Sequence, residues 1–137
     1  MTPVLFDTGV IIAALLKRDP HHQGCSAFIQ ATDRRQRLVP ATVIAEVAGM
    51  VEHLPEIEAA FYDSVAGGSF VLVQIENADL VRMAELVRQY RDFPLGGTDA
   101  SVVAIAERLG VADVATLDHR HFRAIRPAHT PAFNLLP

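Results

Sequence analysis

The sequence predicts an α/β domain with a mainly parallel central sheet. Short apolar runs that fit strands alternate with amphipathic runs that fit helices, and no hairpin signal joins two strands directly. Half of the 137 residues are hydrophobic, Trp is absent and aromatic residues make up 7%, so Val, Leu, Ile and Ala must build the core. That composition suits parallel strands covered by helices. Because the chain has no internal repeat or linker, we expect one domain over residues 1–137.

Local patterns predict the elements of the first half. Val4–Phe6 is an apolar run that ends at Asp7-Thr8-Gly9, which indicates a strand running into a turn. Asp19-Pro20 is a helix-start signal, with Asp as a cap and Pro at the first helical position. The predictions in chain order are a strand at Val4–Phe6, helices at Val10–Leu16 and His21–Thr32, a strand at Leu38–Pro40, and helices at Thr42–Val51 and Pro55–Ala66.

The second half continues the alternation. Phe70–Gln74 fits a strand, and Asn77 is expected to cap a helix that buries a stripe of Leu80, Met83 and Val87. Gly96-Gly97 is expected to form a turn before the next helix. In that helix Thr98 is the expected cap, Asp99 lies in the first turn, Val102, Ile105 and Leu109 are the expected buried side, and Gly110 is the stop. Val111–Thr116 fits a strand, and the proline-containing tail after Asp118 receives no assignment.

Charge and cysteine content exclude several classes. A net charge of −4 argues against holding nucleic acid by bulk positive charge, so any such binding must be local or bridged by cations. Cys25 is the only cysteine, which excludes an internal disulfide and favours a reducing compartment. The apolar run Val4–Leu16 is shorter than the roughly 20 residues of a membrane span and has no basic segment before it. We therefore expect a cytoplasmic protein without a membrane anchor.

Acidic residues from four distant segments are expected to meet at one edge of the sheet. Asp7 follows the first strand and Asp118 follows the strand near Val114, whereas Asp99 and Glu46 lie near helix starts. The carboxyl ends of parallel strands and the N-termini of the crossover helices face the same edge. Each acid also has a purely structural explanation, as a helix cap, a helix-dipole partner, an exposed helix residue or a turn former.

Four neighbouring carboxylates need compensation, because like charges a few ångströms apart raise one another's pKa. Oxygen ligands without Cys or His favour Mg²⁺ or Mn²⁺. Two such ions would stabilise the attacking and leaving oxygens of an in-line phosphoryl displacement. The pattern thus points to metal-assisted phosphodiester chemistry, with one or two ions both possible.

At this point the sequence resembles a PIN-domain ribonuclease, and in length and organisation a VapC toxin of a type II toxin–antitoxin pair. The resemblance runs over nearly the whole chain, through VLFDTGVIIAAL, VPATVIAEV, GGTDASVVAIAERLG and VATLDHRHF, which carry Asp7, Glu46, Asp99 and Asp118 in turn. It implies a three-layer α/β/α sandwich and a Mg²⁺- or Mn²⁺-dependent endoribonuclease that hydrolyses RNA phosphodiester bonds. It also implies a small VapB-like antitoxin that blocks the acidic pocket, a homodimer, and possible hetero-oligomers with the antitoxin.

The resemblance assigns the principal metal to Asp7 and Asp99, with Glu46 and Asp118 tuning it or holding a second ion. Thr8 and Thr98 are candidate supporting residues that would orient a water or an acid, capping being the alternative. His119 and His121 would contact phosphate or belong to a solvated loop. An Arg group would guide RNA or form exposed turns; its members are Arg34, Arg35, Arg37, Arg120 and Arg123.

Other acidic-pocket classes fit less well. A phosphoacceptor receiver needs a late lysine, yet Lys17 is the only lysine, and a haloacid-dehalogenase-like phosphatase needs D-x-D where this chain has DTG. A PIN-like domain that binds RNA or protein without cleavage remains the alternative function. The sequence alone identifies neither the RNA nor the antitoxin.

Overall fold

The computed structural model describes all residues, 1–137, and contains a five-stranded sheet in which every neighbouring pair of strands is parallel. The strands are β1 (Val4–Phe6), β2 (Arg37–Pro40), β3 (Val71–Val73), β4 (Asp113–Ala115) and β5 (Asn134–Leu136), in the order β3-β2-β1-β4-β5. Leu5 of β1 lies opposite Leu38 of β2 on one side and Val114 of β4 on the other. The α/β prediction with a mainly parallel sheet is confirmed.

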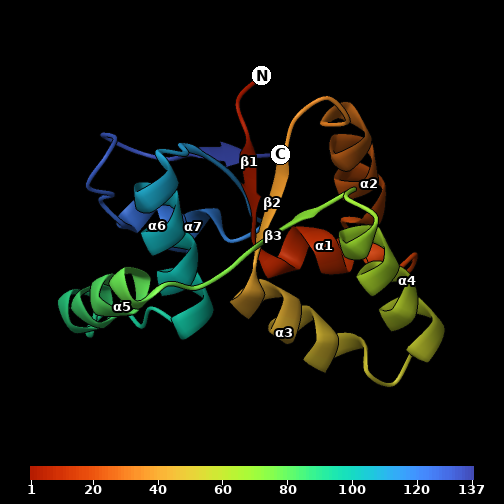
Figure 1. The fold of residues 1–137 in the computed structure, drawn as a ribbon, viewed down its shortest axis with the longest axis horizontal. Helices are drawn as coiled ribbons and strands as arrows, with labels where there is room; N and C mark the ends of the chain where they lie inside the picture. Colours follow the sequence, from red (N-terminus) through yellow and green to blue (C-terminus); the bar gives the residue numbers. More distant parts are fainter.

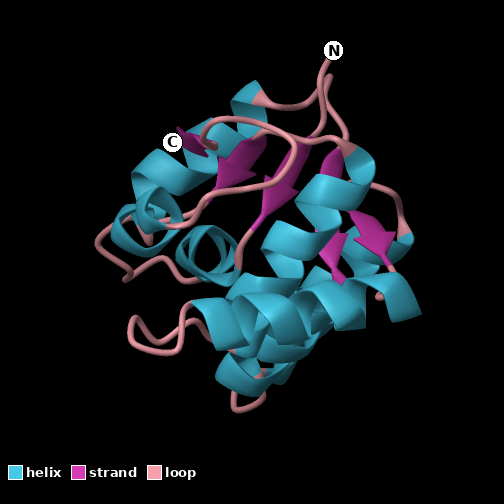
Figure 2. Cartoon of the chain, turned by 90° about the vertical axis from the view of Figure 1, so that its left-hand side faces the viewer, coloured by secondary structure: helices cyan, strands magenta, loops and turns pink.

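Seven helices surround the sheet. They are α1 (Thr8–Leu15), α2 (His22–Ala31), α3 (Ala41–Val51), α4 (Pro55–Ala66), α5 (Asn77–Gln89), α6 (Gly97–Leu109) and α7 (His119–Ala124). Helices α1, α2 and α4 lie on one side of the strands and α5, α6 and α7 on the other, with α3 beyond the carboxyl ends of the central strands (Figure 1). Figure 2 shows the strands between the helical layers. The expected three-layer arrangement is therefore present.

One hydrophobic cluster of 28 buried residues fills the space between the layers. All three residues of β1 are fully buried, and α6 buries every residue from Ala100 to Ala106. The predicted buried positions Val102 and Ile105 belong to this cluster, whereas Leu109 at the end of α6 is exposed. Strand β1 has sheet neighbours on both edges and helices on both faces. It therefore shows no alternation of apolar and polar residues and is apolar throughout.

Helix α5 differs from its prediction. Its cap is Glu76 rather than Asn77, in a reciprocal capping box with Asp79. Leu80 and Val87 are exposed, while Asp79 and Leu86 are buried. The predicted stripe fails because Asp79 pairs with Arg108 of α6, which turns the Asp79–Leu86 side of α5 toward α6.

The tail after Asp118 forms two elements that the sequence did not predict. Asp118 caps α7, and β5 adds to the edge of β4. Both elements are short, and the prolines between them hide any periodicity. No helix of the structure has the length and apolar character required to cross a bilayer.

The Arg108–Asp79 pair gives a test of the α5–α6 contact. Asp79 is 2% exposed, and Nε of Arg108 lies 3.0 and 3.1 Å from its two carboxylate oxygens. Arg108→Met should lower the free energy of unfolding by about 2–4 kcal/mol, because it leaves a buried carboxylate without its partner. Urea denaturation measures this loss.

The matched control places Arg108→Met in an Asp79→Asn background. Asparagine keeps an oxygen for the cap but carries no charge, so the same substitution should then cost under about 1 kcal/mol. Equal costs in both backgrounds would show that charge pairing does not hold α5 against α6.

Candidate functional site

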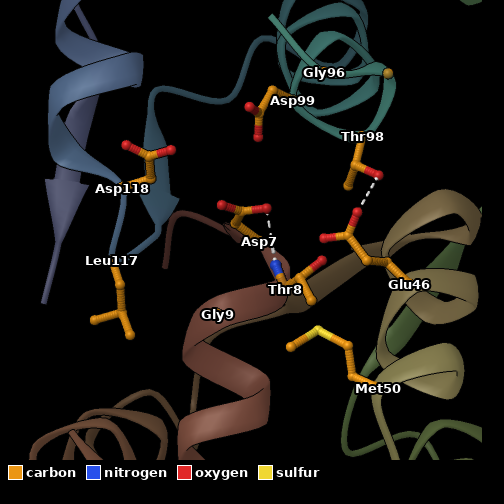
Figure 3. Close-up of a pocket in the computed structure, with 11 residues that line it drawn as sticks. Asp7, Thr8, Gly9, Glu46, Met50, Gly96, Thr98, Asp99, Leu117 and Asp118 are labelled. Carbon is orange, nitrogen blue, oxygen red and sulfur yellow. Dashed lines mark hydrogen bonds between the residues drawn. The ribbon is translucent and has the colours of Figure 1, made fainter.

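The four acids named from the sequence line one cleft of about 550 Å³ at the carboxyl edge of the sheet. Asp7 follows β1, Glu46 lies on α3, Asp99 is in the first turn of α6, and Asp118 follows β4 (Figure 3). Strands β1 and β4 are neighbours although their paired residues, such as Leu5 and Val114, are more than 100 positions apart in the chain. The strand order changes direction between them, which is where α/β sheets bind ligands.

Asp7 is both a helix cap and a buried acid. It is 7% exposed; its Oδ1 accepts the backbone N–H of Thr8 at 2.8 Å and its Oδ2 accepts the hydroxyl of Thr116 at 2.9 Å. Burial raises the pKa of Asp7, these two hydrogen bonds oppose the rise, and the charges of Glu46 and Asp118 add to it. The cap explanation and the expected position in the acidic group are therefore both correct.

Thr116 is a residue that the sequence analysis missed. It is fully buried, donates to Asp7, and accepts the backbone N–H of Asp118 at 2.9 Å. One hydroxyl thus links the acid after β1 to the backbone of the acid after β4. A threonine two residues before Asp118, at the end of a buried strand, was the only signal available in the sequence.

Thr98 does not cap α6, contrary to the prediction. The helix begins earlier, with Gly96 as an N-cap that has no side chain, and the Thr98 hydroxyl instead donates to Oε2 of Glu46 at 2.8 Å. The first turn of α6 therefore presents backbone N–H groups without a side-chain cap beside a cleft lined by Gly96 and Gly97. Such a helix end favours anions.

Asp118 is held by His121. The Nδ1 atom of His121 lies 2.6 Å from Oδ2 of Asp118, and Oδ1 accepts the backbone N–H of His121 at 3.2 Å. The imidazole also packs on Phe93, with ring centroids 4.8 Å apart. His121 is thus a partner of an acid in the cleft, not only a solvated loop residue.

Asp99 has the most perturbed acidity in the cleft. Its pKa rises to about 6, first because burial disfavours the charged form and then because Asp7 and Asp118 repel that charge, with His121 opposing and Glu46 adding slightly. A carboxyl group with this pKa is only partly ionised just below neutrality. The protein supplies no lysine or arginine among the residues lining the cleft to relieve the repulsion.

The donors fit a hard divalent cation, but they do not form a closed cage. No three Asp, Glu, His or Cys side chains of the chain are placed so that they would hold a metal ion together. The acids provide oxygen ligands only, and the hydroxyl of Thr8 is buried in the cleft wall without a hydrogen-bond partner. An open site with few protein ligands and several waters is the usual arrangement for Mg²⁺.

The arginine group of the α2–β2 connection lies away from this cleft. Arg35 pairs with Asp113 and donates to the N-terminal segment, and Arg37 donates to Thr32 and to the carbonyls of Ile29 and Ser69. These contacts are near the amino ends of β1 and β2, opposite the acids. Arg35 and Arg37 therefore have structural roles away from the cleft, but they do not form the exposed turn that was expected, because the Arg35 side chain is 16% exposed and Arg37 belongs to β2.

Comparisons with known proteins agree with this geometry. The family model described as "PIN domain" matches residues 4–126. The chain is 29% identical over 136 residues to Ribonuclease VapC26 of Mycobacterium tuberculosis, covering 98% of this chain and 100% of that protein.

Solved structures share the fold. VapC20 of M. tuberculosis, titled a Sarcin-Ricin loop cleaving toxin, superimposes with a TM-score of 0.80 at 12% identity, covering 93% of this chain and 98% of the other. VapBC2 from Rickettsia felis bound to a promoter DNA fragment gives 0.77 at 12% identity with full coverage of both chains. A toxin–antitoxin complex from Klebsiella pneumoniae gives 0.71 at 20% identity, covering 96% and 99%.

The pKa of Asp99 predicts how metal-free stability depends on pH. Between its ordinary value of 3.8 and about 6 the folded state holds the proton more tightly than the unfolded state, so the free energy of unfolding falls as pH rises through this window. Asp99→Asn removes this loss and should stabilise the chain at pH 7.5 by about 1–3 kcal/mol, with little effect at pH 4.

Urea denaturation in chelator at the two pH values measures this difference. Asp33→Asn, on an exposed loop outside the cleft, is the control and should be neutral at both. An Asp99→Asn gain that is equal at pH 4 and pH 7.5 would contradict the charge-repulsion account.

Proposed function

The chain belongs to the PIN-domain family, and we propose from this premise that residues 1–137 form one PIN domain acting as a metal-dependent endoribonuclease, the VapC-like toxin of a toxin–antitoxin pair. One observation carries the proposal: four carboxylates from separated segments line a single cleft at the switch point of the sheet. The RNA substrate implies action in the cytoplasm.

The acids would hold Mg²⁺ or Mn²⁺. Asp7 and Asp99 are the proposed principal ligands, because they are the most buried pair and the pKa of each is raised by burial and by neighbouring carboxylates, with Glu46 and Asp118 adjusting the ion or holding a second one. When bound, such a cation would offset the charge of the carboxylates and lower the pKa of a water, which would make that water a better nucleophile toward a phosphodiester.

The chain's own residues would hold the acids in place. Thr116 fixes the orientation of Asp7, Thr98 that of Glu46, and His121 that of Asp118. The unpartnered hydroxyl of Thr8 is suited to orient a water beside Asp7, and the uncapped N–H groups of α6 would donate hydrogen bonds to a phosphate oxygen. Preorganised donors and acceptors of this kind lower the cost of reorganisation during the reaction.

The second candidate is a PIN-like domain that binds RNA or protein without cleaving. It is favoured only by the absence of a ready-made three-ligand metal cage. Cleavage assays with added metal separate the two functions.

An apolar groove is the proposed docking site for the antitoxin. It holds about 290 Å³ between α1, α2 and α4, with Ile11, Leu15, Ile29 and Phe61 among its lining residues. Seven of the ten residues that line this groove are hydrophobic, so a partner would gain affinity there by burying apolar surface. Structural relatives are solved as toxin–antitoxin complexes, which supports an antitoxin partner.

Helix α5 is the proposed surface for the homodimer. Leu80, Val81 and Val87 are exposed on it, with Val81 63% and Leu80 53% exposed. Helices α2 and α4 instead pack their apolar sides into the core. The start of α5 is acidic at Glu76 and its end basic at Arg88, so two copies paired antiparallel about a two-fold axis would be complementary in charge.

Cleavage of a panel of single-stranded and structured RNAs with Mg²⁺ or Mn²⁺ tests the main proposal. We expect cleavage that chelator abolishes, and at least about a hundredfold loss of kcat/KM in Asp7→Asn and Asp99→Asn, because each removes a ligand. Both variants should retain the wild-type circular dichroism spectrum.

A substitution of Thr116, which contacts Asp7, tests a partial loss of activity. Thr116→Val keeps the buried shape but loses the hydrogen bond to Asp7, and should lower kcat about tenfold, with Thr116→Ser recovering activity. If the folded wild type cleaves no RNA with either metal, the main proposal is wrong, and a PIN-like domain that binds without cleaving is the function that remains.

Val81→Glu tests the dimer surface. A charge on the exposed stripe of α5 should convert a dimer to a monomer in sedimentation equilibrium, since it buries an unpaired carboxylate at the interface. Leu72→Glu on edge strand β3, where the parent side chain is also exposed, should leave the dimer intact. A monomeric wild type would contradict the proposal.

A further inference from the structure

The acidic cleft contains two large apolar side chains that the core does not need. Met50 is 50% exposed and Leu117 is 37% exposed, and they are the only hydrophobic residues among the eleven that line the cleft. Single exposed apolar residues are common on protein surfaces. Met50 and Leu117, however, line the same cleft, and each lies near an acid. This suggests that both contact one ligand.

Their positions follow from the acids. Met50 lies one helical turn after Glu46 on α3, so the two side chains share a face of that helix. Leu117 immediately precedes Asp118 after β4. A group bound at Glu46 or Asp118 would therefore lie beside one of these apolar side chains.

The two side chains flank the first turn of α1. In Figure 3 Met50 extends toward this turn from one side and Leu117 lies on its other side, below the carboxylates. Gly9 lies between them, and a Cβ atom built there would stand 3.6 Å from Cβ of Leu117. Because Gly9 has no side chain, it adds none to the surface of α1 beside Leu117. We call Leu117, Gly9 and Met50 the apolar shelf.

The chemistry of the cleft limits what the shelf would bind. No aromatic, lysine or arginine side chain lines the cleft, so neither ring stacking nor a direct cationic contact to phosphate is available there. The acids with their cation would take the phosphate group. The part of a nucleotide that gains from leaving water for an apolar surface is the face of its base.

We infer that the apolar shelf receives the bases on either side of the scissile phosphate, so that Met50 and Leu117 set the nucleotide preference of cleavage. The inference rests on the proposed ribonuclease function. It requires RNA whose bases are unpaired at the cut site, because only unstacked bases expose their faces to a protein surface. The chain therefore cuts loops or single strands rather than duplex.

Steady-state kinetics on the RNA that the wild type cleaves best tests the shelf. Met50→Gln and Leu117→Gln should raise KM about 5- to 10-fold with kcat changed less than about twofold, as expected for a lost base contact. Sequencing the new RNA ends should show a weakened preference at the nucleotides flanking the cut. Met50→Leu and Leu117→Met should return KM toward the wild-type value.

The control is Leu72→Gln on β3, which removes a similarly exposed apolar side chain outside the cleft and should change neither KM nor the cut sites. Thermal unfolding confirms that each variant is folded.

Three outcomes overturn the inference. Unchanged KM and cut sites in the shelf variants of an active enzyme exclude base contacts. A loss of kcat at unchanged KM shows that the shelf acts on the geometry of the acids. A change in sedimentation without a change in KM identifies the shelf as a self-association surface. A wild type that cleaves no RNA is a different result, since it refutes the proposed function itself and the shelf inference with it.

Discussion

Mutual repulsion among four carboxylates governs the functional end of this molecule. Asp7 is nearly buried and Asp99 partly so; the charges of Glu46 and Asp118 make ionisation of both less favourable, and the charge of Asp7 adds to this at Asp99. The fold tolerates this because Thr8, Thr98, Thr116 and His121 donate hydrogen bonds that fix three of the acids in place. Hydrogen bonds stabilise an ionised oxygen but do not cancel its charge, so the repulsion among the carboxylates remains.

The distribution of basic residues reinforces this point. Arg35, Arg82 and Arg108 pair with Asp113, Glu107 and Asp79, all outside the cleft. These pairs join the N-terminal segment to β4 and α5 to α6. The arginines thus stabilise the scaffold, while the acids of the cleft have only His121 as a side-chain partner of opposite charge when it is protonated. A net charge of −4 is compatible with RNA chemistry when four of the carboxylates line a cleft where a cation would offset them.

Topology explains how residues so distant in sequence come together. Strand β1 is central, β2 and β3 extend the sheet on one side, and β4 and β5 extend it on the other. The chain leaves β1 toward β2 and β3, and the connection after β3 returns past β1 to β4 on its other side, so the carboxyl ends of β1 and β4 open a crevice. Thr116 spans that crevice by contacting Asp7 and the backbone of Asp118. The same crevice exposes Leu117 beside Gly9, which is why acidic and apolar groups share one cleft.

The sequence by itself determined the α/β class, the parallel sheet, and the positions of β1 to β4 and of the first six helices. It also indicated that four acids meet at one edge of the sheet. These features could be predicted because strand and helix periods, and the residues that end each element, are local properties. It failed where a decision depended on a distant partner. Thr98 looked like a cap until Glu46 came within reach, and the buried side of α5 was decided by Arg108 rather than by its own apolar stripe. Arg35 and Arg37 looked available to RNA until their carbonyl and carboxylate partners were in place. Only the tertiary structure could reveal Thr116, α7 and β5, since a buried hydroxyl, a two-turn helix and an edge strand acquire their stability from neighbours that the local sequence does not contain.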